Sequence, residues 1–307
     1  MTAPAPVFIV NHLSENIAKR GSILESISND VGAVLHNQDI FDCLDIITTQ
    51  TRKDGHDWVF IEGGDGTCQG VITAFLEHYG TDTPLPRFTL IPGGMTNQVA
   101  GVIGLKRPNK ERIKTLLDGM FTKKELPLVK VQSNTNSASY AGFLFSTGAI
   151  PMITEYTKQQ LHNRGIGGSM AVIGGIIRGA SGNGDVMYPT PIDISIAPNT
   201  QFSESHLGTV ITTLPSLFKG LDPFWGKEDG PLRITYARGD YRRLFANIIS
   251  LWRGRMDKDR SKDGLFSYNT STITMHYDGD IVLDGEALTL LGPDFTLIPS
   301  RPVSFLC

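Results

Sequence analysis

Two glycine-rich loops limit the folds open to this chain more than any other part of its sequence. The first reads Val59-Phe60-Ile61-Glu62-Gly63-Gly64-Asp65-Gly66-Thr67, and the second reads Leu90-Ile91-Pro92-Gly93-Gly94-Met95-Thr96-Asn97. In each, an apolar run typical of a buried parallel strand ends in glycines, and a helical pattern begins at once. Such loops let backbone N–H groups approach an anion at the start of a helix. The pair therefore predicts a phosphate site, although each loop alone would also serve as a tight strand–helix turn.

The pattern along the chain changes near residue 124. Before it, apolar runs alternate with helical stretches, which predicts an α/β domain with a parallel sheet over residues 1–123. After it, short alternating or β-branched runs are separated by turn residues, which predicts an antiparallel β-sandwich over residues 124–307. The extreme C-terminus is left free to return to the first domain.

Composition excludes several classes of protein. The 307 residues carry a net charge of −3, which gives no bulk attraction for nucleic acid, so no nucleic-acid partner is expected. The three cysteines, Cys43, Cys68 and Cys307, are far apart and fit a reducing compartment. The sequence from Met1 to Val10 lacks the features of a signal peptide, and no apolar run reaches the length of a membrane span. We therefore expect a cytoplasmic protein that meets a membrane, if at all, peripherally.

Four motifs in these loops and beyond them resemble a known family. Gly63-Gly64-Asp65-Gly66-Thr67 resembles the nucleotide signature shared by diacylglycerol, sphingosine, ceramide and NAD kinases and, more distantly, phosphofructokinases. Asn11-His12-Leu13-Ser14, Pro92-Gly93-Gly94-Met95-Thr96-Asn97 and Asp284-Gly285-Glu286 resemble motifs of the diacylglycerol kinase catalytic-domain branch, which includes bacterial lipid kinases. Their order and spacing cover nearly the whole chain.

The resemblance implies a fold and a set of ligand-binding residues. It implies a phosphofructokinase-like N-terminal α/β domain, a C-terminal β-sandwich and a cleft between them for ATP. Carried over residue by residue, the nucleotide-binding positions are Asn11, Ser14, Gly63, Gly64, Gly66, Thr67, Gly93, Gly94, Thr96 and Asn97.

The same resemblance assigns three acidic residues. Asp65 would act with Mg²⁺ and the phosphates, and Glu286 would be the general base that takes the hydroxyl proton. Asp229 would correspond to a structural Mg²⁺ ligand of bacterial members. For Glu286 the alternative is an exposed hairpin, because Asp284-Gly285 is a common type I′ turn.

The implied function is transfer of the γ-phosphoryl group of ATP to a hydroxyl of diacylglycerol or a similar lipid. Four residues depart from the family pattern, namely Met95, Gln98, Pro127 and Ile150, and the last three stand where the family carries acidic residues. These departures keep a second interpretation open, a catalytically impaired relative that binds nucleotide or lipid. A kinase of a soluble alcohol, as in NAD kinase, is a third.

Two segments of the second domain suggest contacts with other molecules. Arg233–Lys262 contains nine basic residues and three aspartates, a net charge of +6, so it would suit an anionic membrane or form a solvated basic face. Leu214–Trp225 mixes aromatic residues with prolines, and it would either contact lipid or pack against the sandwich. A homodimer is a further state that the sequence leaves open.

Overall fold

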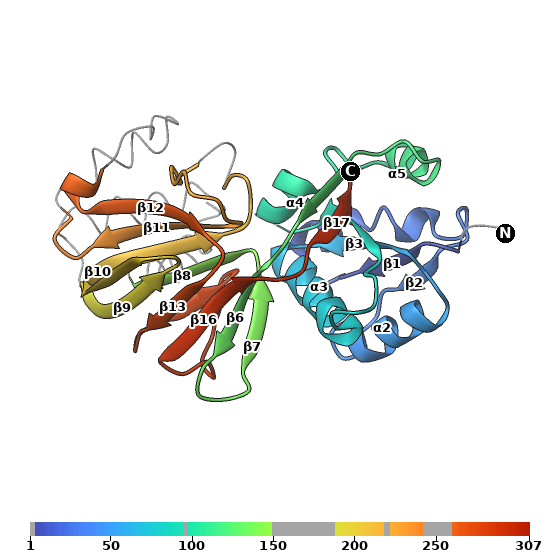
Figure 1. The fold of residues 1–307 in the computed structure, drawn as a ribbon. Helices are drawn as coiled ribbons and strands as arrows, with labels where there is room; N and C mark the ends of the chain where they lie inside the picture. Colours follow the sequence, from blue (N-terminus) through green and yellow to red (C-terminus); the bar gives the residue numbers. More distant parts are fainter. Residues whose placement is uncertain (1–3, 95–96, 149–187, 218–221, 242–259) are drawn as a thin grey trace. The chain divides into compact units, whose positions relative to one another are not determined.

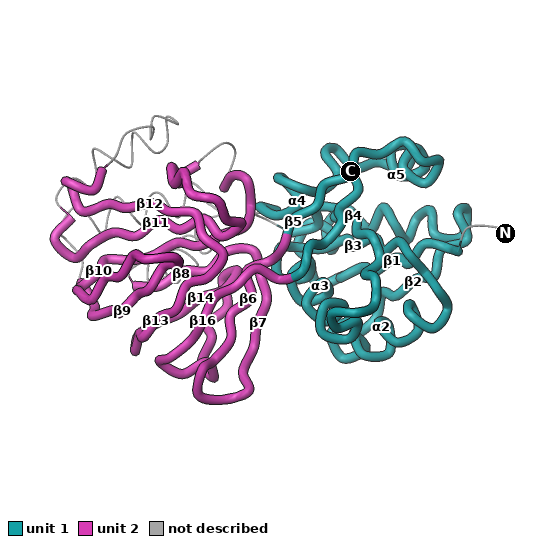
Figure 2. The backbone as a smooth tube through the Cα atoms, viewed as in Figure 1, with its two compact units in different colours: residues 1–126, 301–307 teal, residues 127–300 magenta. Residues whose placement is uncertain are grey.

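The computed structural model divides the chain into two compact units (Figures 1 and 2). Unit 1 comprises Met1–Leu126 and Arg301–Cys307, and unit 2 comprises Pro127–Ser300. The boundary lies after Leu126 and not after residue 123 as expected, because strand β5 (Lys123–Leu126) belongs to unit 1. The end of the chain also belongs to unit 1, which is the return to the first domain that the sequence analysis left open. The structure describes residues 4–94, 97–148, 188–217, 222–241 and 260–307.

Unit 1 is built on a six-stranded sheet. Its strands follow the order β2-β1-β3-β4-β17-β5, and every neighbouring pair is parallel except β17 with β5. The remaining strands are β1 (Val7–Val10), β2 (Val34–His36), β3 (Trp58–Gly63), β4 (Arg87–Pro92) and β17 (Val303–Leu306). This arrangement confirms the α/β domain with a parallel sheet that the sequence predicted.

Helices cover both faces of this sheet. On one face Phe8 and Phe60 share a buried cluster with residues of α1, η1 and α5. On the other face Phe88 of β4 meets Phe75 of α3 edge-on, with ring centroids 5.4 Å apart. Because both faces are covered, β1 and β3 are buried at every position. The helices are α1 (Glu15–Arg20), η1 (Glu25–Ile27), α2 (Leu44–Lys53), α3 (Asp65–Tyr79), α4 (Gln98–Ile103) and α5 (Lys110–Leu117).

The end of the chain is an internal strand of unit 1. β17 lies between β4 and β5, where the Thr89 hydroxyl donates a 2.9 Å hydrogen bond to the Leu306 carbonyl. Trp58 Nε1 donates to the same Thr89 oxygen at 3.0 Å. A segment more than two hundred residues away in sequence therefore completes the sheet that carries both glycine loops.

In its described residues, unit 2 is an antiparallel sheet of eleven strands. The path runs β15-β14-β8-β10-β9-β13-β16-β6-β7; off this path, β11 pairs with β10, and β12 pairs with β11. The sequence predicted the antiparallel all-β architecture, and the structure confirms it with one continuous hydrogen-bonded sheet. The strands are β6 (Val129–Ser133), β7 (Ser139–Gly142), β8 (Leu144–Gly148), β9 (Thr190–Ile196), β10 (Thr200–Thr212), β11 (Leu232–Arg238), β12 (Leu265–Thr270), β13 (Ile273–His276), β14 (Ile281–Leu283), β15 (Glu286–Ala287) and β16 (Asp294–Pro299).

The long strand β10 lets this sheet curl around one core. Its first half pairs with β9, and its second half pairs with β8 and β11, with a register shift between His206 and Gly208. Side chains from both branches join a single cluster, in which Phe145 contacts Phe295 at a centroid distance of 5.8 Å. A sheet that folds over in this way provides two packed layers without a second separate sheet.

The two segments flagged in unit 2 are partly described. Leu214, Leu217 and Phe224 are buried, so the described part of the aromatic segment packs against the protein, and residues 218–221 lie outside the described ranges. Arg233 donates to Asp222 at 2.7 Å and lies 4.8 Å above the Phe224 ring. Of the basic segment, residues 242–259 lie outside the described ranges. None of the helices in the described ranges is both long and apolar enough to cross a bilayer.

Candidate functional site

The two glycine loops pack directly against each other in unit 1. The Gly93 amide donates a 2.7 Å hydrogen bond to the Gly63 carbonyl. A Cβ atom built on Gly94 would lie 2.7 Å from the Gly64 Cα, which is closer than real Cβ atoms approach backbone. Glycine is therefore required at Gly94 by the contact between the loops themselves, before any ligand is considered.

The segment that follows β1 forms hydrogen bonds with the first glycine loop. Asn11 Nδ2 donates to Thr67 Oγ1 at 2.8 Å, and the Gly64 amide donates to Ser14 Oγ at 3.3 Å. The carboxyl ends of β1, β3 and β4 thus meet at one edge of the sheet, where ligands bind in open α/β sheets. Asn11, Ser14 and Thr67 hold this edge together, in addition to any contact with a nucleotide.

Gly66 is the open position of the first loop. It is exposed, and a Cβ built on it would meet no atom within 4 Å. Gly66 is the second residue of α3, and the N–H groups of a first helical turn have no acceptor inside their helix. Free donors beside open space suit the oxygens of a phosphate, so the residues present fit a nucleotide here.

The second loop is shaped by Asn97. Asn97 has a left-handed backbone with φ 47°, and its side chain bonds both the N–H and the carbonyl of Gly94. Asn16 of α1 also donates to the Gly94 carbonyl, at 2.5 Å. The structure therefore brings Asn97 to the predicted site as a residue that fixes the loop. Thr96 and Met95 lie outside the described residues.

The carboxylate of Asp65 caps α4. It accepts hydrogen bonds from the backbone N–H groups of Gln98, at 3.0 Å, and Val99, at 2.9 Å. Burial raises the pKa of Asp65, while these two donated bonds act to lower it. The residue assigned to Mg²⁺ and the phosphates thus also ties the first glycine loop to the helix after the second.

An Asp65→Ala substitution is expected to lower the free energy of unfolding by about 1–3 kcal/mol. The change leaves the Gln98 and Val99 N–H groups without their acceptor. Chemical denaturation of the ligand-free protein measures the effect, with Asp45→Ala at an exposed position of α2 as the control. Equal stability of the two variants would contradict the capping role.

Glu62 is a buried residue whose role the sequence analysis did not identify. Its side chain has no solvent exposure, and it accepts from Ser22 Oγ at 2.6 Å, the Leu24 amide at 3.0 Å and Arg20 Nη2 at 3.2 Å. Arg20 Nη2 also donates to the Pro92 carbonyl at 2.9 Å. Glu62 therefore anchors the chain after α1 to the start of the first loop. The sequence did contain a sign of this role, because Glu62 is a charged residue at the end of an otherwise apolar strand.

In unit 2, Asp284 and Gly285 form a two-residue hairpin turn between β14 and β15, and Glu286 is the first residue of β15. Asp284 and Gly285 both have positive φ, 51° and 91°, as a type I′ turn requires. The Asp284 carboxylate accepts from the backbone N–H groups of Phe143 and Leu144, both at 2.8 Å. Glu286 is exposed at the start of β15. The turn is the hairpin named as the alternative, and Asp284 fixes it so that Glu286 is presented to solvent.

Asp229 is exposed in the segment before β11, and among the described residues no group of three His, Cys, Asp or Glu side chains could hold a metal ion. The role of Asp229 as a structural Mg²⁺ ligand stays a prediction. In nucleotide-dependent enzymes Mg²⁺ is commonly held by one or two carboxylates together with the substrate phosphates, and Asp65 is the carboxylate assigned to that role.

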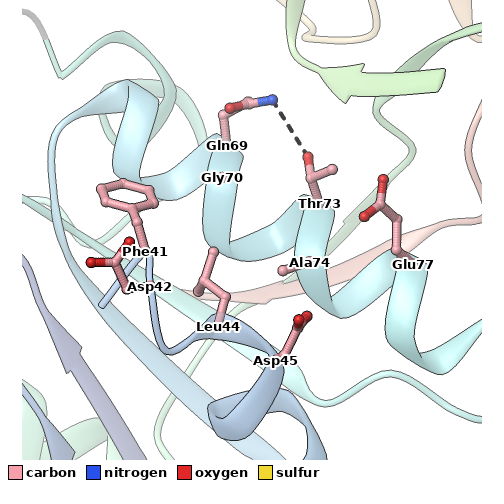
Figure 3. Close-up of a pocket in the computed structure, with 9 residues that line it drawn as sticks. All are labelled: Phe41, Asp42, Leu44, Asp45, Gln69, Gly70, Thr73, Ala74 and Glu77. Carbon is pink, nitrogen blue, oxygen red and sulfur yellow. Dashed lines mark hydrogen bonds between the residues drawn. The ribbon is translucent and has the colours of Figure 1, made fainter. Parts of the chain in front are cut away.

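A separate cavity of about 290 Å³ lies between the start of α2 and the middle of α3 (Figure 3). Its lining includes Asp42, Asp45 and Glu77, and Phe41 and Leu44 supply an apolar part. Three carboxylates make it unsuited to a phosphate. The glycine loops stay the predicted phosphate site, and this cavity is a distinct feature of unit 1.

The comparisons with known proteins address the domain that holds these loops. The family model for the diacylglycerol kinase catalytic domain matches residues 7–129. A search of curated protein sequences finds no significant match.

Two solved structures from Bacillus anthracis str. Sterne share the fold of the whole chain. One, provisionally named a diacylglycerol kinase, is 14% identical with a TM-score of 0.69, and the other, a diacylglycerol kinase, is 15% identical with a TM-score of 0.61. Each alignment covers 99% of this chain and 97% of the other. Residues 7–129 of this chain therefore belong to the diacylglycerol kinase catalytic-domain family, a family of kinase-type transferases, as the motifs of its sequence predicted.

Proposed function

We propose that the protein is an ATP-dependent lipid kinase that phosphorylates a hydroxyl of diacylglycerol or a similar lipid. The observation that carries this proposal is Gly66, an open, exposed glycine in the first turn of α3, within a domain of the diacylglycerol kinase catalytic family. The surrounding loop is fixed by Asn11, Ser14 and Gly93 before any ligand binds. Such preorganisation is what phosphoryl transfer requires, since positioning and charge stabilisation supply most of its catalysis.

The proposed reaction makes one bond and breaks another. The lipid hydroxyl oxygen attacks the γ-phosphorus of ATP, and the bond from that phosphorus to the β–γ bridging oxygen breaks. The hydroxyl proton passes to the Glu286 carboxylate, and the products are the phosphorylated lipid and ADP. Asp65 would hold the Mg²⁺ that accompanies ATP, and the ion would supply neutralisation of the phosphate charge.

The proposed substrate also requires access to a lipid surface. The basic segment Arg233–Lys262 is the proposed contact with anionic membrane, because its net charge is +6. In the described part, Arg233, Arg238 and Arg260 pair with aspartates, so the attraction would come from the remaining basic residues. The protein is proposed to be cytoplasmic and to bind the membrane peripherally.

A turnover assay with purified protein tests the proposal. ADP release from ATP and Mg²⁺ is measured with mixed micelles of diacylglycerol, sphingosine or ceramide, and with soluble alcohols as the comparison. We expect turnover only with a micellar lipid, and ATP binding in calorimetry without any acceptor. ATP binding without transfer to any acceptor would favour the second interpretation, a catalytically impaired relative that still binds nucleotide. The presence of Gln98 where the family carries an acidic residue is the sequence feature that suggests it. No ATP binding would reject both.

A further inference from the structure

Gln98, the first residue of α4, carries an unpaired buried amide. Its Nε2 atom is buried and has no hydrogen-bond acceptor within the described ranges. Other polar groups of this segment are matched: the Gln98 backbone N–H donates to Asp65, and the Asn97 side chain bonds Gly94 on two sides. The unpaired amide is therefore an exception beside these satisfied hydrogen bonds.

A buried donor without an acceptor lowers the stability of the free protein. Native proteins contain few such groups, and those that persist call for an explanation such as a binding role. The backbone N–H of Gln98 donates a hydrogen bond to the Asp65 carboxylate, and Asp65 directly precedes the open Gly66 in the sequence. The acceptors that a nucleotide would bring to this place are the oxygens of its phosphates.

We propose that the Gln98 amide donates a hydrogen bond to a phosphate oxygen of the bound nucleotide, an inference that rests on the nucleotide site of the proposed function. The family pattern has an acidic residue at this position, and a carboxylate beside a phosphate needs a cation between the two. A neutral amide binds the oxygen directly. The contact made by Gln98 itself therefore needs no metal ion.

Calorimetric titration of ATP in EDTA, beside thermal melting of the ligand-free protein, tests this role. Gln98→Leu is expected to lower ATP affinity about tenfold or more, and to leave the melting temperature unchanged or higher because it removes an unpaired polar group. Gln98→Glu is expected to lower the affinity further in EDTA, since it places a carboxylate against the phosphate. Added Mg²⁺ should restore part of the Gln98→Glu affinity by bridging the two anions.

Gln50 on α2 provides the matched control, because it is exposed and lies on another helix of unit 1. Gln50→Leu and Gln50→Glu are expected to bind ATP as the wild type does. Wild-type ATP affinity in both Gln98 variants would overturn the inference and leave the proposed function standing. A lower melting temperature of Gln98→Leu with unchanged ATP affinity would have the same two consequences. If the wild type binds ATP only with Mg²⁺, as the proposed role of Asp65 allows, the variants are compared in Mg²⁺, where wild-type affinity in Gln98→Leu would overturn the inference. A wild-type protein that binds no ATP under either condition would instead reject the proposed function.

Discussion

A Gly66→Val protein is expected to fold normally and to lose at least about a hundredfold in affinity for ATP. The fold should tolerate the change, because a Cβ at Gly66 meets no atom within 4 Å and the backbone there is helical. Valine is also a better helix former than glycine. Any loss of binding is therefore assigned to the ligand and not to damage of the loop.

The expected magnitude follows from the donors that the valine side chain would obstruct. A hydrogen bond to a charged group is worth about 1.5–3 kcal/mol, and the side chain would separate a phosphate from at least two N–H groups of the first turn. Losing two such bonds corresponds to at least about a hundredfold in the dissociation constant. Gly66→Ala, with a smaller side chain, should give an intermediate loss in the same titration.

Gly101→Val is the matched control for this experiment. Gly101 is also exposed and helical, and a Cβ built there likewise meets nothing within 4 Å. Both variants should melt at or above the wild-type temperature, and only Gly66→Val should lose affinity. Wild-type ATP binding by a folded Gly66→Val protein would remove the first glycine loop from the proposed site.

The sequence was sufficient to predict the α/β unit, the antiparallel unit and the two glycine loops. Strand ends of a parallel sheet share one edge, so runs that end in Gly63 and Pro92 could be placed together before the structure was known. The sequence could not predict that Asp65 caps α4, because the two N–H groups that donate to its carboxylate lie 33 and 34 residues further along the chain. Those bonds exist only after the loops have closed on each other, and no local pattern records that.

Long-range pairing explains the other differences from the sequence-based expectations. The sequence analysis left the end of the chain free to return to the first domain, but the place of β17 between β4 and β5 depends on which edge of the sheet was left unpaired. The Asp284 clamp on Phe143 and Leu144 similarly joins residues about 140 positions apart. Sequence patterns report which segments form strands, whereas their partners are selected by packing in three dimensions.

Glu286→Gln is expected to lower kcat by about 10²–10⁴-fold and to leave ATP affinity unchanged. Glu286 is the proposed base, and the amide keeps its shape but cannot accept the hydroxyl proton. Asp65 is a poor substitute, because its carboxylate already accepts two backbone bonds and is the proposed partner of Mg²⁺. The fold should be unaffected, since Glu286 is exposed and the hairpin is fixed by Asp284. Steady-state turnover and ATP calorimetry on the same preparation separate the two effects.

Asp280→Asn is the control for charge, because Asp280 is an exposed acid just before β14 on the same hairpin. It should keep wild-type kcat, whereas Glu286→Gln should not. The pH profile adds a readout that a structural role would not change: if Glu286 is the base, the acidic limb of kcat in the wild type should vanish in Glu286→Gln. A Glu286→Gln enzyme with full turnover would refute the assignment. The general base would then have to come from another acid, and the residues that replace the family's acids at Gln98 and Pro127 offer no carboxylate.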